Sequence, residues 1–195
     1  MGDANQLNFL KRHVPSVAGP VLEIGSKDYG NTQDFRAVYS GNEYVGLDME
    51  QGPGVDIVHD LTTGVGPLRP DHFELAICCS VLEHVRRPWV FAEHLSGVIQ
   101  NGGILYLAVP WVWRFHAFPD DYFRFSWRGI EELFPEFEWH HRTYSTTIIG
   151  EFVPATENAD NDFALFVKKP SGNRKYLPHL MLHVIGYKGR QQNCA

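Results

Sequence analysis

Short apolar runs alternate with stretches of helical pattern along the first 110 residues of the chain. The apolar runs are rich in Val, Ile and Leu and end at Gly, Asp or Pro, which is typical of buried strands. They predict strands at 20–25, 43–48, 55–60, 73–79 and 103–110. The stretches between them predict helices at 4–13, 31–38 and 87–100, and Pro88 and Asn101-Gly102 punctuate the two ends of the last one.

This alternation predicts an α/β fold with a doubly wound, mostly parallel, Rossmann-like sheet, because strands joined through helices make right-handed crossovers. Two later apolar runs, around 137–150 and 162–168, predict a hairpin that adds an antiparallel edge strand. Ligands of such sheets bind at the carboxyl ends of the strands. We therefore expect the functional residues to follow the predicted strands directly.

The pattern changes after Pro110. The segment "WVWRFHAFPDDYFRFS" (111–126) is too aromatic and too charged for a plain linker, and "WRGIEELF" after it predicts a helix with Ser126 as N-cap. From Phe163 onward the chain has no acidic residue. We divide the chain into one domain at 1–168 and a basic C-terminal extension at 169–195. Because its centre, "YLPHLMLHVIGY", is apolar, we expect the extension to dock on its own domain or to form a homodimer with a second copy, the alternative being a disordered tail.

Composition narrows the class of protein. The chain has 195 residues, of which 44% are hydrophobic, so a single domain can bury a substantial core. The net charge of −6 argues against a nucleic-acid partner, which would need clustered Lys and Arg. Three cysteines, two of them adjacent, suggest no disulfide framework and favour a reducing, cytoplasmic setting. The chain contains no run of about 18 consecutive apolar residues, so we expect no membrane span. Its N-terminus lacks a continuous apolar segment, so we expect no secretion signal.

The loop after the first predicted strand, "VLEIGSKDYG" (21–30), lacks the usual phosphate-binding chemistry. Gly25 and Gly30 have the spacing of a P-loop, but Asn31 stands where the motif needs its Lys, so the phosphate-binding ammonium is missing before Thr32. A dinucleotide site needs a second glycine where Lys27 stands. An acidic residue, Asp48, follows Gly25 by 48 − 25 = 23 positions, which suits a carboxylate that binds ribose hydroxyls. The pattern therefore indicates a ligand with a ribose and without a pyrophosphate.

The order of five motifs resembles the class I S-adenosylmethionine-dependent methyltransferases of the group with an "LEHV" signature. The motifs are "VLEIGS", "YVGLDME", "VDIVHDL", "FELAICCSVLEHV" and "NGGILYLAVP", and the resemblance covers about residues 18 to 168. It implies S-adenosyl-L-methionine as cofactor and the class I methyltransferase fold. It also implies a set of cofactor-binding residues: Glu23, Gly25, Ser26, Asp48, Met49, Asp60, Leu61, Cys79 and Ser80. The sequence departs from the family at Lys27, where a glycine is usual, and at Glu74, where an aspartate is usual.

Several of these residues have a second interpretation. Gly25 could be a turn glycine, and Asp48 could be a solvated strand end. Asp60 is the residue expected to bind the adenine amine of the cofactor. It could instead cap a helix, and Asp56 could bind the adenine in its place. Glu83 and His84 could belong to a solvated face, or His84 could act as a general base near neutral pH. The pair also resembles part of the E-x-x-E-H metal motif of small-RNA 2′-O-methyltransferases. Because Ser80 stands where that motif has its first Glu, we expect no metal.

The segment 111–126 is the predicted acceptor side, since a similar P-x-D-Y-x-R-F stretch follows the fifth strand in related methyltransferases. Its candidate substrate-binding residues are Trp111, Trp113, Asp121, Tyr122 and Arg124. An aromatic wall that includes His116 would suit a planar or sugar-like acceptor, and the candidate catalytic residues are His84, His116 and Tyr122. The structural alternative is an ion pair of Arg124 with Asp120 or Asp121 that fixes the loop.

The sequence thus predicts a methyltransferase that alkylates an oxygen or nitrogen of a small-molecule acceptor by in-line displacement. The alternatives are an NAD(P)-dependent oxidoreductase on a similar sheet and a catalytically silent binding module. A short-chain dehydrogenase would carry Tyr-x-x-x-Lys, which is absent from the chain. Retention of Gly25, Asp48 and Asp60 argues against the silent module.

Overall fold

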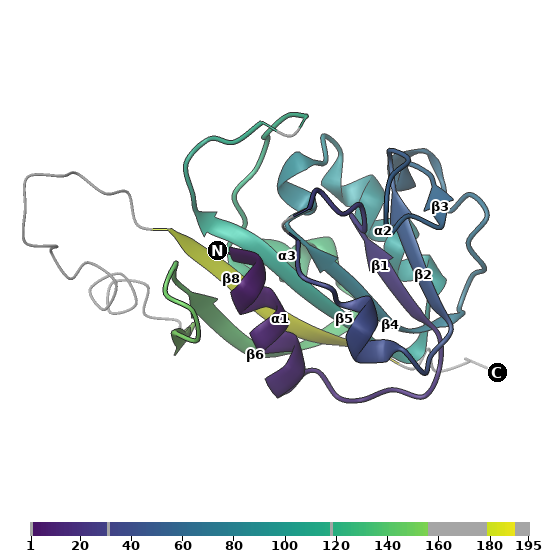
Figure 1. Ribbon diagram of the computed structural model, residues 1–195, viewed down its shortest axis with the longest axis horizontal. Coiled ribbons are helices and arrows are strands. Elements are labelled where there is room, and N and C mark those ends of the chain that lie inside the picture. The colour runs from purple at the N-terminus through teal and green to yellow at the C-terminus, as the bar shows by residue number, and fades with distance from the viewer. Residues whose placement is uncertain (1, 31, 118, 156–178, 190–195) are drawn as a thin grey trace, which may run out of the picture.

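One mixed sheet organises the chain. The computed structural model describes residues 2–30, 32–117, 119–155 and 179–189, and in these ranges eight strands pair in the order β3-β2-β1-β4-β5-β8-β6-β7 (Figure 1). The strands β1 to β5 are parallel, while β8 is antiparallel to both β5 and β6, and β7 is antiparallel to β6. Their bounds are β1 Val21–Ile24, β2 Tyr44–Asp48, β3 Ile57–Val58, β4 Phe73–Cys79, β5 Ile99–Val112, β6 Phe137–Ser145, β7 Phe152–Pro154 and β8 Leu180–Lys188.

The strand predictions are confirmed, with differences at two of them. The run 55–60 forms only the two-residue strand β3, since Asp56 and Asp60 use their carboxylates in loop and cap contacts. Strand β5 begins earlier than predicted, at Ile99, whose backbone is already extended where it ends the preceding helix. The predicted helix at 87–100 therefore stops at Val98.

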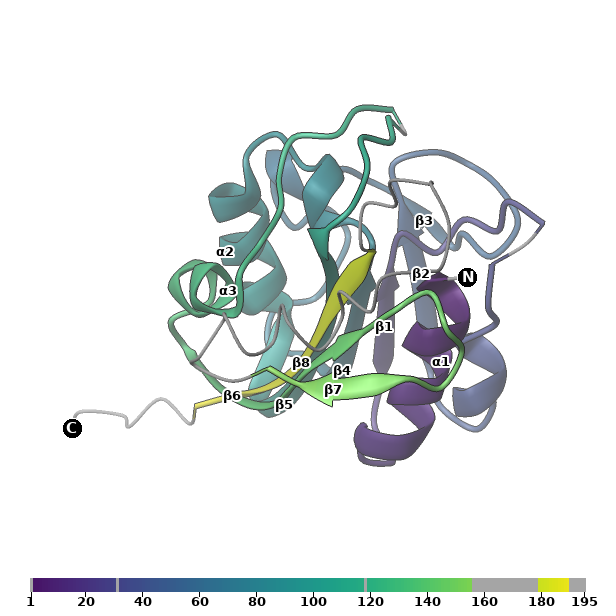
Figure 2. The same cartoon turned by 90° about the vertical axis from the view of Figure 1, so that its left-hand side faces the viewer.

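Helices cover both faces of the sheet, as Figure 2 shows. On one face lies α1 (Gly2–His13), whose Phe9 and Leu10 are buried with Tyr106 of β5. On the other face lie α2 (Pro88–Val98) and α3 (Trp127–Leu133), which share a core cluster with the sheet. The predicted cap of α3 is confirmed, because the Ser126 hydroxyl accepts a hydrogen bond from the Gly129 N–H at 3.1 Å.

The predicted helix at 31–38 is shorter in the structure. Only a 3₁₀ turn, η1 (Arg36–Tyr39), forms there. Two aspartates explain the difference, because such side chains compete for backbone groups near helix starts. Asp28 accepts from the Gly30 N–H at 2.7 Å, and Asp34 accepts from the Ala37 N–H at 2.9 Å. The described residues between them, 29–30 and 32–33, form no helix.

Part of the C-terminal extension belongs to the sheet. Residues 180–188, placed by the sequence analysis outside the domain that ends at 168, form β8 between β5 and β6. The strand is almost entirely buried, and both of its edges pair with strands of the same chain. This part of the extension therefore docks on its own domain, the first of the two expected arrangements. Of the predicted hairpin, the run 137–150 supplies β6, whereas 162–168 lies outside the described residues.

No described helix combines the length and the apolar character that crossing a membrane requires.

Candidate functional site

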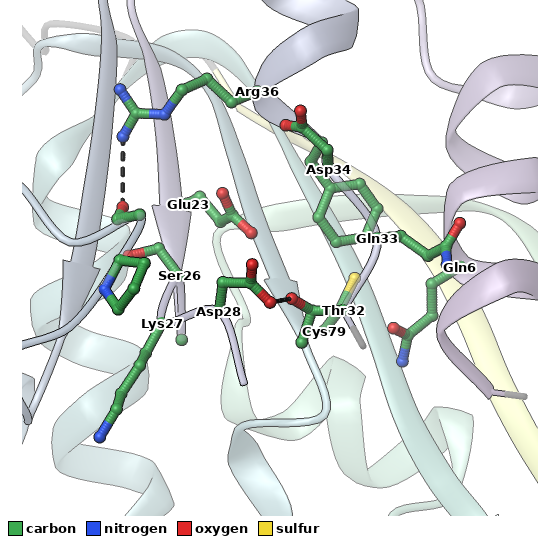
Figure 3. Close-up of a pocket in the computed structure, with 14 residues that line it drawn as sticks. Gln6, Glu23, Ser26, Lys27, Asp28, Thr32, Gln33, Asp34, Arg36 and Cys79 are labelled. Atoms are coloured by element: carbon green, nitrogen blue, oxygen red, sulfur yellow. Dashed lines mark hydrogen bonds between the residues drawn. The ribbon is translucent and has the colours of Figure 1, made fainter. Parts of the chain in front are cut away.

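A cavity of about 330 Å³ opens at the carboxyl end of β1, within the range of about 300–1,000 Å³ that is usual for ligand sites. It lies where the sequence analysis expected the ligand, between the loop after β1, the η1 region and the start of α1 (Figure 3). The lining residues are Gln6, Glu23, Gly25, Ser26, Lys27, Asp28, Thr32, Gln33, Asp34, Phe35, Arg36, Pro53, Gly54 and Cys79. Four predicted cofactor residues are among them: Glu23, Gly25, Ser26 and Cys79.

Gly25 makes the turn from β1 into the loop. Its φ of +76° is a conformation that residues with a side chain rarely adopt, and its N–H donates to the Leu47 carbonyl at 2.8 Å. A Cβ at this position would lie 2.6 Å from Cγ2 of Val81. The glycine thus lets the loop after β1 and the loop after β4 approach each other closely. Next to it, the buried Ser26 hydroxyl has no hydrogen-bond partner among the described residues.

The cavity lining is acidic. Glu23, Asp28 and Asp34 contribute three carboxylates. Burial raises the pKa of Glu23 to about 7, although a 2.6 Å hydrogen bond from the Tyr44 hydroxyl opposes the shift.

The two cations of the lining are already paired with other carboxylates. Lys27 extends away from Glu23 in Figure 3 and pairs with Glu50 at 2.6 Å. Arg36 pairs with Asp56 and also donates to the Gly54 carbonyl at 3.3 Å. The lining therefore favours a ligand that carries positive charge.

Asp48 ends β2 beside this loop, outside the cavity lining. One carboxylate oxygen accepts from the Lys27 N–H at 3.2 Å, and the other accepts from the Glu50 N–H at 3.0 Å. Its neighbour Met49 is 53% exposed. The carboxylate fixes the loop after β1, and its remaining lone pairs are at the strand end where a ribose was expected.

Asp60 and Leu61 lie farther along, also outside the cavity lining. Asp60 caps the 3₁₀ turn η2 (Leu61–Thr63), because its carboxylate accepts from the N–H and the hydroxyl of Thr62 at 2.7 and 2.8 Å. Leu61 is a core residue, 2% exposed. Asp60 therefore acts as a cap in the structure, as its second interpretation expected. Asp56, the other candidate for binding the adenine, accepts from the Gly46 N–H and pairs with Arg36.

The chain after β4 is strained at Ser80. Its φ is +54°, and such backbone outliers in residues other than Gly concentrate at functional sites. Its hydroxyl accepts a 2.8 Å hydrogen bond from the amide of Gln6 in α1. Gln6 also lines the cavity, and sequence reasoning missed it because nothing in the chain order brings the N-terminal helix to this strand end. The cavity residues Gln33 to Arg36 were missed because a helix was predicted there.

The predicted acceptor segment follows β5 and is held by Arg124. Its guanidinium contacts both oxygens of Asp121, at 2.5 and 2.7 Å, and donates to the carbonyls of Trp113 and Arg114. The expected ion pair that fixes this loop is therefore present, and Asp121 is the partner of Arg124. Trp111 packs against the core, and Tyr122 is 42% exposed.

A second polar cluster joins this segment to the turn η3 (Leu82–His84). Glu83 is fully buried, and neither carboxylate oxygen has a hydrogen-bond partner within the described part of the chain. Nε2 of His84 and Nε2 of His116 lie 3.8 and 3.9 Å from its Oε1. Burial raises the pKa of Glu83 to about 8 and lowers the pKa of His84. The candidate catalytic residues His84 and His116 are thus brought together, whereas Tyr122 contributes its backbone N–H to the Glu83 carbonyl at 2.8 Å.

No protein-family model matches the chain, and a search of curated proteins finds no match either. Solved structures match over nearly its whole length. A methyltransferase of Archaeoglobus fulgidus described as SAM-dependent has a TM-score of 0.62 at 14% identity, covering 93% of this chain and 92% of that one. The 1,6-didemethyltoxoflavin-N1-methyltransferase of Burkholderia thailandensis, with S-adenosylhomocysteine bound, has a TM-score of 0.62 at 13% identity and covers 96% and 79%.

The chain has the class I methyltransferase fold. This confirms the predicted fold class, including the mostly parallel sheet and its antiparallel strands at one side. The phosphoethanolamine N-methyltransferase 2 of Haemonchus contortus, in complex with phosphomonomethylethanolamine and S-adenosylhomocysteine, shares the fold with a TM-score of 0.60 at 16% identity. The match covers 95% of this chain, which spans about half (52%) of the Haemonchus protein.

Proposed function

We propose that the protein is an S-adenosylmethionine-dependent methyltransferase that acts on an oxygen or nitrogen of a small-molecule acceptor. The observation that carries the proposal is the acidic cavity at the end of β1. S-adenosylmethionine carries a sulfonium and an ammonium group, so three carboxylates in the lining are favourable neighbours for it. The order of the motifs, which resembles that of the class I methyltransferases, and the fold of the chain both support the same cofactor.

The same lining argues against the nicotinamide alternative. A pyrophosphate needs backbone N–H groups and cations that are free to meet it. Here Lys27 and Arg36 are paired with Glu50 and Asp56, and the lining aspartates Asp28 and Asp34 would repel the phosphates. A dinucleotide would therefore bind with a large electrostatic penalty.

The cofactor supplies a methyl group that its sulfonium already activates. The chain's own residues would bind and orient it: Gly25 allows close backbone approach, Ser26 offers an unpaired hydroxyl, and Asp48 is at the strand end for the ribose. The segment 111–126 would form the acceptor side and exclude water from the transfer. Its own His116 and the neighbouring His84 are the groups that an acceptor would meet.

The test is calorimetric titration of the purified chain with S-adenosylmethionine, S-adenosylhomocysteine and NAD. We expect both adenosyl ligands to bind and NAD to show no heat. Glu23→Gln should weaken S-adenosylmethionine binding about tenfold by removing a carboxylate that faces the ligand. Glu138→Gln is the matched control, because this side chain is 80% exposed on β6, which three strands separate from β1, and it does not line the cavity. Tight NAD binding without a response to S-adenosylhomocysteine would overturn the proposal.

Methyl transfer itself needs a second measurement. The chain is incubated with a small-molecule extract and S-adenosylmethionine labelled in its methyl group, and products are searched by mass spectrometry. Label in a new small molecule supports the enzyme and identifies the acceptor. Cofactor binding without any labelled product from extracts of several sources would favour the silent binding module instead.

A further inference from the structure

Glu83 is a buried carboxylate that the described contacts leave unsatisfied. Its side chain is 1% exposed, and neither oxygen accepts a hydrogen bond from any described residue. Burying a carboxylate in this way is costly unless it is paired or coordinates a metal. The nearby Arg124 directs its guanidinium to Asp121 and to backbone carbonyls. A partner for Glu83 must therefore come from elsewhere.

Two histidines face the same carboxylate with their unprotonated nitrogens. Nδ1 of His84 contacts the Asp120 carbonyl, which can only accept, so this nitrogen carries the hydrogen and Nε2 carries the lone pair. Nδ1 of His116 lies 3.3 Å from the Arg114 carbonyl and 3.3 Å from Oδ2 of Asp121, and both can only accept, so in the neutral ring its Nε2 also carries the lone pair. Both Nε2 atoms then point at Oε1 of Glu83, from 3.8 and 3.9 Å. Three acceptor atoms that converge need a cation between them.

A shared proton does not explain this arrangement. A protonated Glu83 could donate to one histidine only, and both nitrogen-to-oxygen distances exceed hydrogen-bond length. A metal ion can contact all three atoms together. Ligand atoms of a tetrahedral zinc site are about 3.4 Å apart, as follows from bond lengths of about 2.0–2.1 Å. The three ligand atoms lie within 4.8 Å of one another, so small rotations of the two rings would close the site.

We propose that Glu83, His84 and His116 bind one divalent transition-metal ion, with Zn²⁺ as the preferred ion and a fourth position open. Two imidazoles and one carboxylate suit zinc and its neighbours better than Mg²⁺ or Ca²⁺, which prefer oxygen ligands alone. The Asp120 carbonyl contacts Nδ1 of His84, and the Asp121 carboxylate lies 3.3 Å from Nδ1 of His116. Such oxygen partners on the second ring nitrogen are usual around metal-bound histidines. A site with three protein ligands leaves room for an exogenous oxygen or nitrogen.

The fold explains why the sequence suggested no metal. That expectation was based on the stretch 80–84, where Ser80 replaces a ligand of a known motif. The third ligand comes instead from the loop after β5, 116 − 84 = 32 residues later. Strands β4 and β5 are neighbours in the sheet, so the chain segments after them meet at one edge. The inference goes beyond the proposed function and does not depend on it, because metal binding can be measured without S-adenosylmethionine.

The experiment uses the full chain without a histidine tag, freed of metal by a chelator. Zn²⁺ is titrated in competition with a chromophoric chelator, and Co²⁺ is titrated with detection of its visible absorption. We expect one equivalent of tight Zn²⁺ binding and intense cobalt bands typical of four-coordination. Glu83→Gln, His84→Ala and His116→Ala should each weaken Zn²⁺ binding by more than about 100-fold. Loss of a residue that only supports a ligand typically costs about 10- to 100-fold in metal affinity, so a larger effect identifies a ligand.

His140→Ala is the matched control, since His140 lies 3.3 Å from Glu138 in an exposed pair on β6. It should leave Zn²⁺ affinity unchanged. His116→Cys guards against variants that fail to fold, because it should retain Co²⁺ and add a thiolate charge-transfer band in the near ultraviolet. The absence of stoichiometric Zn²⁺ binding, or binding that the three ligand variants retain, would overturn the proposal.

Discussion

Arg124 and Asp121 form a two-pronged ion pair, with guanidinium nitrogens 2.5 and 2.7 Å from the two carboxylate oxygens. The Asp121 side chain is 1% exposed, and the ion pair with Arg124 holds the pKa of its carboxyl well below the usual range. The same carboxylate accepts from the His116 N–H at 2.8 Å. One ion pair thus fixes the loop after β5 and the position of His116.

Arg124→Ala should therefore destabilise the protein by about 3–5 kcal/mol, because it leaves the Asp121 carboxylate buried without its partner. Arg124→Lys should recover part of this loss, since it restores the positive charge but not the bidentate hydrogen bonding of the guanidinium. Chemical denaturation monitored by fluorescence measures the difference. Arg128→Ala is the control, because Arg128 is 66% exposed in its pair with Glu131 and should cost less than about 1 kcal/mol. Similar losses in the two alanine variants would contradict the role of the Asp121 pair.

Gly25→Ala should reduce both stability and binding of S-adenosylhomocysteine. The new Cβ would meet Val81 at 2.6 Å in a backbone conformation that already disfavours a side chain. Gly30→Ala is a close control, since Gly30 also has a positive φ but has nothing within 4 Å of its Cβ position. It should show the backbone strain alone, about 1 kcal/mol.

The double variant Gly25→Ala/Val81→Ala separates the two contributions. If the clash with Val81 matters, removing the valine side chain should restore part of the lost affinity and stability relative to Gly25→Ala. Thermal unfolding and calorimetric titration of the three variants test this. Equal effects of the Gly25 and Gly30 variants would show that the close approach of the two loops is unimportant.

Asp48→Ala should weaken S-adenosylhomocysteine binding tenfold or more. The reason is the loss of charge-assisted hydrogen bonds to the ribose, worth roughly 1.5–3 kcal/mol each. Because the carboxylate also accepts from the Lys27 and Glu50 N–H groups, the variant should lose some stability too. Asp48→Asn keeps an acceptor oxygen and should lose less of both. Unchanged affinity in Asp48→Ala, measured by calorimetry, would show that this carboxylate serves only the loop.

The buried His183 predicts a loss of stability in acid. It is enclosed by Tyr106 and Ser145, whose side chains are 3.0 and 2.7 Å from its ring nitrogens, and burial lowers its pKa to about 3. Below pH 6.5 the unfolded chain binds a proton at this histidine that the native state does not bind. Stability is therefore lost as the pH falls from about 6.5 towards 3, by about 2 kcal/mol between pH 6.5 and 5.

Comparison with His183→Gln isolates this effect, because the variant keeps the other titrating groups, including His13, which in its protonated form also lowers the pKa of His183. The difference in unfolding free energy between wild type and variant should shrink by about 2 kcal/mol over that pH range. His140→Gln, at an exposed position, should show no such change. A difference that stays constant with pH would contradict a neutral His183 in the native state.

The sequence was sufficient for the parallel half of the sheet because each strand there is a continuous apolar run that ends at a turn residue. It was sufficient to place Gly25 and Glu23 at the cavity, because both lie at the end of β1. It was insufficient for the Glu83, His84 and His116 cluster, whose members come from loops after two different strands. It also missed Gln6, which reaches the cavity only because α1 packs on the sheet.

The C-terminal strand shows the same limit most clearly. The run in 180–188 is visibly apolar, but nothing in chain order says that it pairs between β5 and β6. Its Lys188 looks like a surface residue of a basic tail. In the structure its ammonium is buried and donates to the carbonyls of Ser96 and Ile99, each at 2.8 Å, where α2 ends and β5 begins. These contacts join the strand to two elements that precede it by about 90 residues.

A chain that ends at residue 179 should consequently lose cooperative folding, because β5 and β6 would lose their shared partner and expose two unpaired edges. A chain that ends at residue 189 is the control, since it keeps every contact of β8 among the residues that the structure describes. Lys188→Met tests the point without a deletion: it keeps the apolar stem but leaves the two carbonyls without their buried donor, which should cost about 2–4 kcal/mol. Urea denaturation and far-ultraviolet circular dichroism measure all three. A chain ending at 179 that unfolds cooperatively at the same urea concentration as the full chain would show that β8 is dispensable.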